Sequence, residues 1–270
     1  MKIELMQFAK YITLLVLLIS SSYMRGQVSP IPQGHSHNDY DRENPLFDAL
    51  EAGMTSIEID VILVNGTIIV AHDEEEYDIS NTIDKIYFQP ISKLIKKRGG
   101  DLYAEKSRRQ IQLLIDLKTK GEEILKVLDT EVQNYKLLFD RRGLDKKWSP
   151  MQIVLSGEVD KDLILGSRKY KYFHVDGRCP DVKKKYASYE MPLISEKYTK
   201  HFKWIGEGEP KKKEVKKLKR LIKKVQSQGK KLRFWATPDN EEVWAYLLDQ
   251  GVDYINVDDL DRFQKYMSTR

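Results

Sequence analysis

The sequence has 270 residues, a formal net charge of +5 at pH 7, and charged side chains at 32% of its positions. That mild positive charge suits a small anionic substrate and gives no reason to expect nucleic acid as a partner. Cys179 is the single cysteine, which excludes an intramolecular disulfide framework, so a hydrophobic core must stabilise the fold.

The first residues carry an export pattern. Lys2 and Lys10 precede an apolar run from Ile12 to Ile19, which three serines follow. The run is shorter than the roughly 20 apolar residues that span a bilayer. It predicts a signal peptide over residues 1–27 and an exported, periplasmic or secreted mature protein. An uncleaved anchor or a buried helix is the alternative.

Residues 28–270 suit one domain of alternating strands and helices. Strands are expected at 31–34, 56–61, 67–70, 112–118, 151–155, 172–175, 193–195, 231–236 and 254–257, with a surface loop over 74–87. Helices are expected at 91–98, 122–139, 160–165, 210–228, 241–250 and 260–267. Asn65-Gly66 predicts a β-hairpin between the second and third of these strands.

The alternation of strands and helices predicts a parallel sheet, because parallel strands need crossover connections. Without the hairpin's return strand there are eight such units, which favours an α/β fold of the (β/α)₈ TIM-barrel type with a hairpin after the second strand. An open doubly wound sheet is the alternative. No glycine-rich dinucleotide fingerprint follows the first strand.

The strand over 56–61 carries two carboxylates, Glu58 and Asp60, at alternate positions. They therefore share one face. Two carboxylates so close repel each other unless a cation lies between them, and hard divalent cations prefer oxygen ligands. The hairpin returns His72 to the end of this strand, where an imidazole is a candidate acid or base.

Active sites of such barrels lie at the carboxyl ends of the strands. In this sequence those ends gather carboxylates, imidazoles, a lysine, a tryptophan and an asparagine, namely His35, His37, Glu58, Asp60, His72, Asp116, Lys118, Trp235, Asn256 and Asp258. No Ser-His-Asp elbow or Cys-His nucleophile pair is present, so acyl transfer is not favoured.

These motifs resemble the glycerophosphodiester phosphodiesterase and phosphatidylinositol-specific phospholipase C-like superfamily. The resemblance is closest to the altered-inheritance-of-mitochondria branch and its bacterial relatives, and it covers nearly all of the mature chain. It rests on the order and spacing of Gly34-His35-Ser36-His37-Asn38-Asp39, Glu58-Ile59-Asp60, His72-Asp73, Leu114-Ile115-Asp116-Leu117-Lys118, Phe202-Lys203-Trp204, Phe234-Trp235-Ala236-Thr237 and the segment 248–255.

The resemblance implies one divalent cation, Mg²⁺ or Ca²⁺, held by Glu58, Asp60 and Asp116. It also implies acid–base catalysis by His35 and His72. Lys118, His37, Trp235 and Asn256 are then expected to bind the substrate. Typical glycerophosphodiesterases have His-Arg-Gly at the first strand and Glu at the third, where this chain has His35-Ser36-His37 and Asp116. Phosphodiester chemistry is therefore expected, while the head group stays open.

The expected function is metal-dependent cleavage of a small or lipid phosphodiester by a monomer. An attacking water would make the protein a hydrolase, and a hydroxyl of the substrate would make it a lyase with a cyclic phosphate product. A non-catalytic barrel that binds a phosphorylated ligand is the alternative. A two-carboxylate glycoside hydrolase is disfavoured because Glu58 and Asp60 share one strand. The lysine-rich helix over 210–228 is read as a solvated outer face, with peripheral membrane contact at most.

Overall fold

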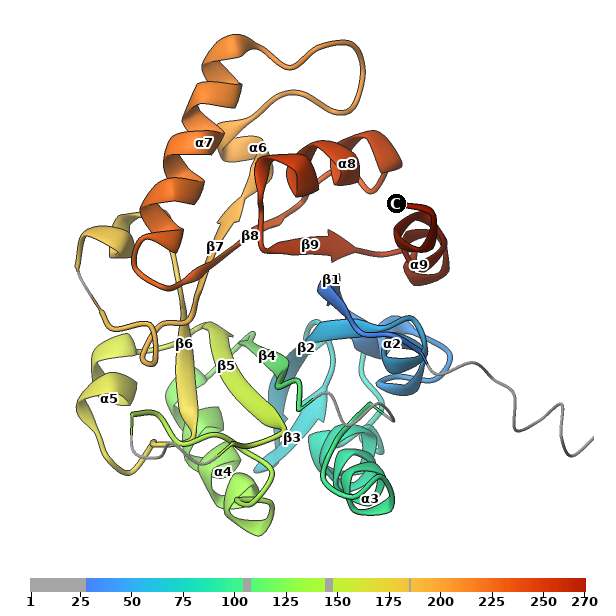
Figure 1. Ribbon diagram of the computed structural model, residues 1–270. Coiled ribbons are helices and arrows are strands. Elements are labelled where there is room, and N and C mark those ends of the chain that lie inside the picture. Colours follow the sequence, from blue (N-terminus) through green and yellow to red (C-terminus); the bar gives the residue numbers. More distant parts are fainter. Residues whose placement is uncertain (1–27, 104–107, 144–147, 185) are drawn as a thin grey trace, which may run out of the picture.

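The computed structural model describes residues 28–103, 108–143, 148–184 and 186–270 (Figure 1). Its strands are β1 (Ile31–Ser36), β2 (Met54–Val64), β3 (Thr67–Val70), β4 (Ile111–Leu117), β5 (Met151–Gly157), β6 (Phe173–Gly177), β7 (Leu193–Lys197), β8 (Lys231–Trp235) and β9 (Tyr254–Val257). Its helices are α2 (Phe47–Glu51), α3 (Gln89–Lys97), α4 (Gly121–Asn134), α5 (Lys161–Gly166), α6 (Tyr198–His201), α7 (Lys212–Gln226), α8 (Glu241–Gln250) and α9 (Leu260–Thr269). The predicted signal peptide lies outside the described residues.

The strands form a closed barrel. They follow the order β1-β9-β8-β7-β6-β5-β4-β2, and β1 pairs with β2 to close the ring. Every pair in this ring is parallel. Figure 1 shows β1 between β9 and β2, with the helices outside the strands. The predicted TIM barrel is confirmed.

The predicted hairpin is also confirmed. β3 runs antiparallel to β2, with Val64 opposite Thr67, so Asn65 and Gly66 form the two-residue turn. Both turn residues have positive φ, 49° for Asn65 and 79° for Gly66. A tight hairpin turn with φ positive at both positions is one that Asn-Gly adopts readily.

The helices agree with the sequence pattern except at short or irregular segments. α8 begins after Asn240, whose side chain accepts a hydrogen bond from Val243 N at 2.9 Å, and ends at Gln250, which Gly251 follows as the C-cap. Helix α2 was not predicted, and α4 ends at Asn134, five residues before the expected end. The expected loop over 74–87 ends in the short helical turn η2 (Asp84–Phe88), which leads into α3.

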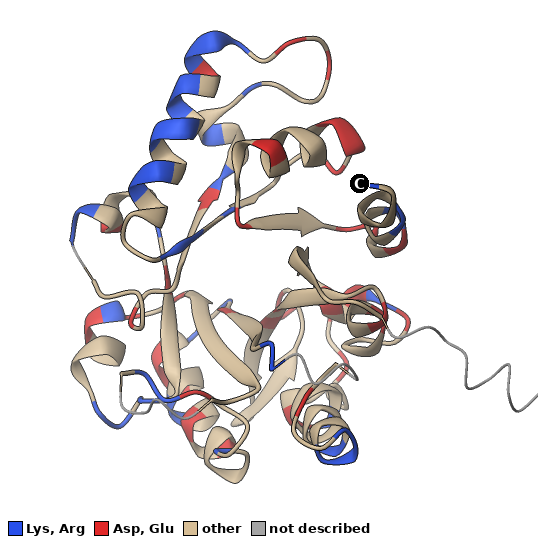
Figure 2. Ribbon diagram, viewed as in Figure 1, with Lys and Arg blue, Asp and Glu red and all other residues tan. Residues whose placement is uncertain are grey.

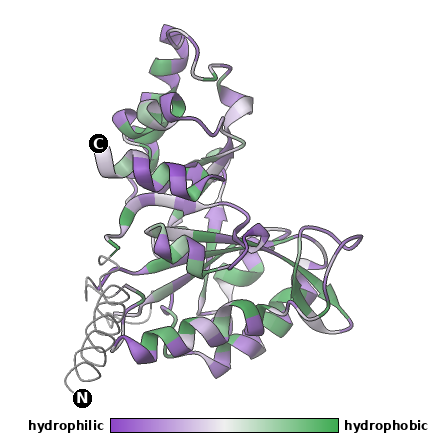
Figure 3. Ribbon diagram, turned by 90° about the vertical axis from the view of Figure 1, so that its right-hand side faces the viewer, coloured by the Kyte–Doolittle hydropathy of each residue, from purple (hydrophilic) through white to green (hydrophobic). Residues whose placement is uncertain are grey.

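The core has two layers. The outward-facing strand residues, such as Ile57 and Ile59, are fully buried, and they pack against the apolar faces of the helices. A separate cluster fills the barrel interior with one side chain from each of four strands, namely Leu114, Val154, Leu193 and Tyr254. Glu58 lies beside Leu114 in the β2–β4 register, so it shares the inward face. The helices alternate between hydrophobic and hydrophilic residues, as Figure 3 shows.

Positive charge gathers on α7, the lysine-rich outer helix (Figure 2). Its apolar residues Leu218, Ile222 and Val225 are buried against the barrel, while most of its lysines face outward. No helix in the described part of the chain is long and apolar enough to cross a membrane.

Candidate active site

Asp60 is the centre of the polar cluster at the barrel mouth. Its carboxylate is almost fully buried, and Oδ2 accepts hydrogen bonds from Tyr40 at 2.8 Å and from His72 Nδ1 at 2.8 Å. Lys118 Nζ lies 2.9 Å from the same oxygen. Burial raises the pKa of Asp60. The Lys118 charge and the hydrogen bonds from Tyr40 and His72 lower this pKa, but they offset the effect of burial only in part. The other oxygen, Oδ1, is buried and has no hydrogen-bond partner among the described residues.

Lys118 lies between the carboxyl ends of β2 and β4. Asp60 and Asp116 are partners in the parallel register of β2 and β4, so both carboxylates face the mouth. Lys118 Nζ lies 2.7 Å from Asp116 Oδ2. Burial lowers the pKa of Lys118, but its hydrogen bond to Asp116 and the charge of Asp60 outweigh this, and the net pKa is raised. The ammonium therefore stays charged at neutral pH.

His72 is held at its inner nitrogen and open at its outer side. Its side chain is 64% exposed although Nδ1 is bound to the buried Asp60. An ionised carboxylate can only accept a hydrogen bond, so in the neutral ring Nδ1 carries the proton and Nε2 keeps its lone pair. The β2–β3 hairpin produces this arrangement, because it brings the chain back beside Asp60.

His35 has a different environment. It is fully buried, with Nδ1 2.7 Å from Ser56 Oγ and Nε2 2.9 Å from Glu58 Oε2. Arg233 Nη2 donates to the same Glu58 oxygen. Burial, reinforced by the nearby Arg233 charge, lowers the pKa of His35 to about 4. His35 is therefore neutral at pH 7.

Arg233 holds the Glu58 carboxylate in its ionised form. Burial alone would raise the pKa of Glu58, but the Arg233 charge and the His35 hydrogen bond outweigh it, so this pKa lies well below its usual range. Asn256, also buried, accepts from Arg233 Nε at 3.1 Å. Gln112 donates to Ser56 Oγ at 2.7 Å and completes the support under His35.

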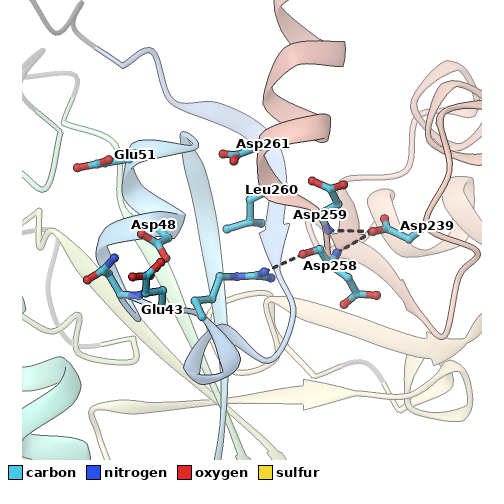
Figure 4. A pocket seen from close by; sticks show the side chains of 10 residues that line it. Glu43, Asp48, Glu51, Asp239, Asp258, Asp259, Leu260 and Asp261 are labelled. Carbon is cyan, nitrogen blue, oxygen red and sulfur yellow. Dashed lines mark hydrogen bonds between the residues drawn. The ribbon is translucent and has the colours of Figure 1, made fainter.

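His37 lies at the edge of the mouth where β1 meets β9. Its Nδ1 is 2.7 Å from Asp258 Oδ1. Asp258 also lines a cleft of about 710 Å³. Figure 4 shows this cleft between Glu43, Asp48 and Glu51 on one side and the acidic segment Asp258–Asp261 on the other.

The β6 and β8 ends contribute a cation and an aromatic ring. Arg178, with 36% of its side chain exposed, pairs with the buried Asp176 and donates to Ser156 Oγ at 3.0 Å. Trp235 is partly buried, and Lys197 Nζ lies 5.2 Å from its ring centre. These side chains border the mouth across the barrel from β2.

The three predicted metal ligands fit a hard cation by their chemistry. Glu58, Asp60 and Asp116 supply carboxylate oxygens from neighbouring strands, and the buried Asp60 Oδ1 has no hydrogen-bond partner among the described residues, so it is available to a cation. Within the described residues the three carboxylates do not converge to within 4.8 Å of one another. Lys118 lies between Asp60 and Asp116, and Arg233 and His35 hold Glu58.

The fold brings the predicted residues to one mouth but in two groups. Asp60, His72, Lys118 and Asp116 form one, and His35 and Glu58 form the other. Sequence reasoning missed Tyr40, Ser56, Arg178 and Arg233. Arg233 follows the period-2 pattern of β8 and could have been placed on the inward face. Tyr40 lies in an irregular segment, where periodicity gives no signal.

Comparison with known proteins decides the family. The AIM6-like phosphodiesterase domain matches residues 22–176, more than half of the chain. The chain belongs to the AIM6-like phosphodiesterase family. Residues 231–261 also match the glycerophosphoryl diester phosphodiesterase family. Together they confirm the superfamily that the motifs indicated.

Two fungal proteins are similar to this AIM6-like chain. Altered inheritance of mitochondria protein 6 of Eremothecium gossypii is 26% identical over 86% of this chain and 68% of its own length. Its homolog in Arthroderma benhamiae is also 26% identical, over 88% of this chain and 84% of its own length.

Solved structures share the barrel. A glycerophosphodiester phosphodiesterase from Parabacteroides distasonis superposes with a TM-score of 0.54 at 17% identity, over 90% of this chain and 99% of that chain. One from Agrobacterium tumefaciens gives 0.51 at 17% identity, over 87% and 100%. At this identity the likeness shows the fold of the AIM6-like chain and nothing finer.

Proposed function

We propose that this protein is a metal-dependent phosphodiesterase that cleaves a phosphodiester of the glycerophosphodiester or phospholipid head-group type. One observation carries the proposal. A solvent-exposed imidazole, His72, is oriented by a buried carboxylate, Asp60, which also holds the Lys118 ammonium. A proton-transfer group and a cation thus share one anchor at the mouth of a barrel from a phosphodiesterase family.

The substrate phosphate would lie against Lys118 and Arg178. Both side chains are partly exposed, 23% for Lys118 and 36% for Arg178. Both keep a carboxylate partner, so they are held in place before the substrate arrives. Arg178 would supply from the β6 end the guanidinium that a His-Arg-Gly motif would have carried on the first strand.

His72 would transfer protons at Nε2. With Nδ1–H donated to Asp60, neutral His72 can accept a proton from an attacking hydroxyl, and Asp60 then stabilises the imidazolium. His35 would be the second proton-transfer group. Because both its ring nitrogens are bound in the structure, its Nε2 must leave Glu58 before it can act.

One divalent cation, Mg²⁺ or Ca²⁺, would be held by Glu58, Asp60 and Asp116. When bound, it supplies positive charge for the non-bridging phosphate oxygens. Tyr40 helps to hold Asp60 on the inward face. Trp235 would border the substrate at the β8 end. The attacking group is water in the hydrolase reading and a hydroxyl of the substrate in the lyase reading.

Single substitutions test these roles. We expect Asp60→Asn and Asp116→Asn to lose both binding of the divalent cation, measured by calorimetry, and turnover. His35→Ala and His72→Ala should keep cation binding and lose about 10²–10⁴-fold in kcat. Glu75→Gln, an exposed change on the loop after His72, is the matched control. Near-normal turnover in both histidine variants would refute the acid–base assignment. Phosphorus NMR of the product separates a monoester from a cyclic phosphate.

The second candidate is a barrel that binds a phosphorylated ligand without turnover. The burial of His35, with both ring nitrogens hydrogen-bonded, favours this second candidate, because a binding protein needs no free imidazole at the site. Under that reading a phosphomonoester binds and no diester is cleaved.

Export belongs to the phosphodiesterase proposal. Residues 1–27 would be removed, and the barrel would be active outside the cytoplasm.

A further inference from the structure

A second cluster of metal-ligand side chains lies behind the barrel wall. Cys179, Glu196 and His201 each offer one ligand atom, and the three atoms lie within 4.8 Å of one another. Cys179 begins the 3₁₀ helix η3 (Cys179–Lys183), Glu196 lies on β7, and His201 ends α6. Three elements that are separate in the chain therefore meet at one point.

The cluster is on the outer side of β7. Leu193 belongs to the cluster that fills the barrel interior, so the alternation of the strand turns Glu196 the other way. Ile194, two residues before Glu196, is part of the outer core. The cluster is thus separated from Asp60 and His72 by the wall of the barrel.

Three buried polar atoms at the cluster have no well-formed hydrogen bond within the described residues. Glu196 is 4% exposed, and its Oε2 is buried and unpartnered. Both ring nitrogens of His201 are also buried and unpartnered. Nε2 of His201 is 3.7 Å from Glu196 Oε2, too long for a hydrogen bond. Buried polar groups are almost always paired, so these atoms point to an absent partner.

The donor set identifies the chemistry of that partner. One sulfur, one imidazole nitrogen and one carboxylate oxygen suit a borderline-soft divalent ion, whereas Mg²⁺ and Ca²⁺ prefer oxygen alone. Ligand bonds of about 2.0–2.3 Å in a tetrahedral arrangement separate the ligand atoms by roughly 3.3–3.8 Å. For a nitrogen–oxygen pair this separation is about 3.3–3.5 Å, so the 3.7 Å between His201 Nε2 and Glu196 Oε2 must shorten by a few tenths of an ångström when the ion binds.

We propose that Cys179, Glu196 and His201 form a zinc site that ties η3 and α6 to β7. A water molecule would complete the tetrahedron, since Cys179 is only partly buried and leaves a route to solvent. On binding, the Cys179 thiol forms the Zn–S bond and releases its proton to solvent, and no electrons are transferred. Thiolate and carboxylate together neutralise the ion.

The neighbouring groups are compatible with this assignment. Oε1 of Glu196 takes the nearby donors, Lys197 N and Lys200 Nζ, each at 3.3 Å, and leaves Oε2 for the ion. Burial and the Lys217 charge lower the pKa of His201, which favours the neutral imidazole that a metal needs. Burial and the Glu196 charge raise the pKa of the Cys179 thiol to about 12, so the thiol loses its proton only when the metal binds. The Lys200 side chain is 61% exposed and can turn into solvent.

Cobalt spectroscopy tests the site, because Co²⁺ can replace Zn²⁺ and a cobalt–thiolate bond absorbs in the near ultraviolet. Cys179 is the single cysteine of the sequence, so any such band reports this residue. The metal-stripped full-length chain is titrated with Co²⁺ in buffer that contains excess Mg²⁺, which occupies the proposed carboxylate site at the mouth. We expect the band to saturate at one equivalent and to disappear when Zn²⁺ is added.

Variants separate this site from the mouth. Cys179→Ser should abolish the band, and His201→Gln and Glu196→Gln should each weaken cobalt binding at least ten-fold. His72→Gln is the matched histidine control, and Asp60→Asn removes a proposed mouth ligand; both should keep the band. Circular dichroism checks that each variant is folded.

Two outcomes would overturn the proposal. The first is a wild-type chain with no thiolate band. The second is a band of unchanged affinity in both His201→Gln and Glu196→Gln, which would mean cobalt bound to a lone thiol. Failure of the phosphodiesterase assay would leave either result unaffected.

Discussion

Replacing Arg233 by Met should cost more stability than any exposed ion pair can contribute. Arg233 is 2% exposed and donates to Glu58, which is 8% exposed. Arg233→Met keeps most of the side-chain volume but leaves the Glu58 carboxylate buried without its cation. Burial, the largest cause of the lowered pKa of His35, remains in the variant and opposes protonation of His35, so His35 replaces the lost charge at most in part.

The magnitude follows from the burial. Breaking a buried pair by removing one partner typically costs about 3–5 kcal/mol. For a domain of this size each kcal/mol lowers Tm by about 2–4 °C, so Tm should fall by roughly 10 °C. The matched control is Arg262→Met. Arg262 pairs with Glu241 at 3.1 Å, but both side chains are nearly half exposed, and such a pair contributes about 1 kcal/mol or less.

Urea and thermal denaturation of the two variants measure the difference, in buffer with EDTA so that no divalent cation replaces the guanidinium beside Glu58. The double variant Glu58→Gln with Arg233→Met should regain part of the loss, because no charge is then left buried. An Arg233→Met protein within about 1 kcal/mol of the wild type would refute the reasoning. It would mean that water or another group already compensates Glu58.

Three further predictions concern pH, substrate binding and export. Burial and the Asp84 charge raise the pKa of Glu131 from 4.5 to about 7 in the folded protein. The folded state therefore binds this proton more tightly than the unfolded state does, and the free energy of unfolding falls as pH rises from about 4.5 to about 7. Glu131→Gln should therefore stabilise the protein at pH 8 by about 1 kcal/mol once partial exposure is allowed for, which raises Tm by a few degrees. At pH 4.5 the Tm should be unchanged. Equal gains at both pH values in thermal denaturation would contradict this. Lys118→Ala should lower kcat/KM at least ten-fold in a steady-state assay, and an unchanged value would remove Lys118 from the site. N-terminal sequencing of protein from the native host should begin near residue 28, and an intact Met1 on soluble cytoplasmic protein would contradict export.

Most of the barrel could be predicted because its signals are local. The Asn65-Gly66 turn and the alternation along β2 depend on neighbouring residues, and they placed the hairpin, Glu58 and Asp60 correctly. The strand that carries Asp116 was expected to end at the same mouth as the strand that carries Asp60, and the structure pairs the two residues in register. Short segments such as α2 were missed, since five residues give too little periodicity to detect.

The partners of the carboxylates could not be predicted, because they depend on contacts across the barrel. Glu58 and Arg233 are 175 positions apart in the chain. The sequence left Glu58 unpaired and so favoured a cation as its partner, whereas the fold already supplies a guanidinium. The burial of His35 has the same origin, since Ser56 and Gln112 enclose it from neighbouring strands.

The measurement that tests the phosphodiesterase account most directly is cleavage of phosphodiesters by the full chain with and without a metal chelator. The substrates are glycerophosphocholine, lysophosphatidylcholine and bis(p-nitrophenyl) phosphate. We predict that at least one is cleaved, that EDTA abolishes the cleavage, and that Mg²⁺ or Ca²⁺ restores it. Cleavage that persists in EDTA would contradict the metal dependence. Binding of a phosphorylated ligand with no cleavage of any diester by the metal-loaded protein would establish the non-catalytic barrel instead.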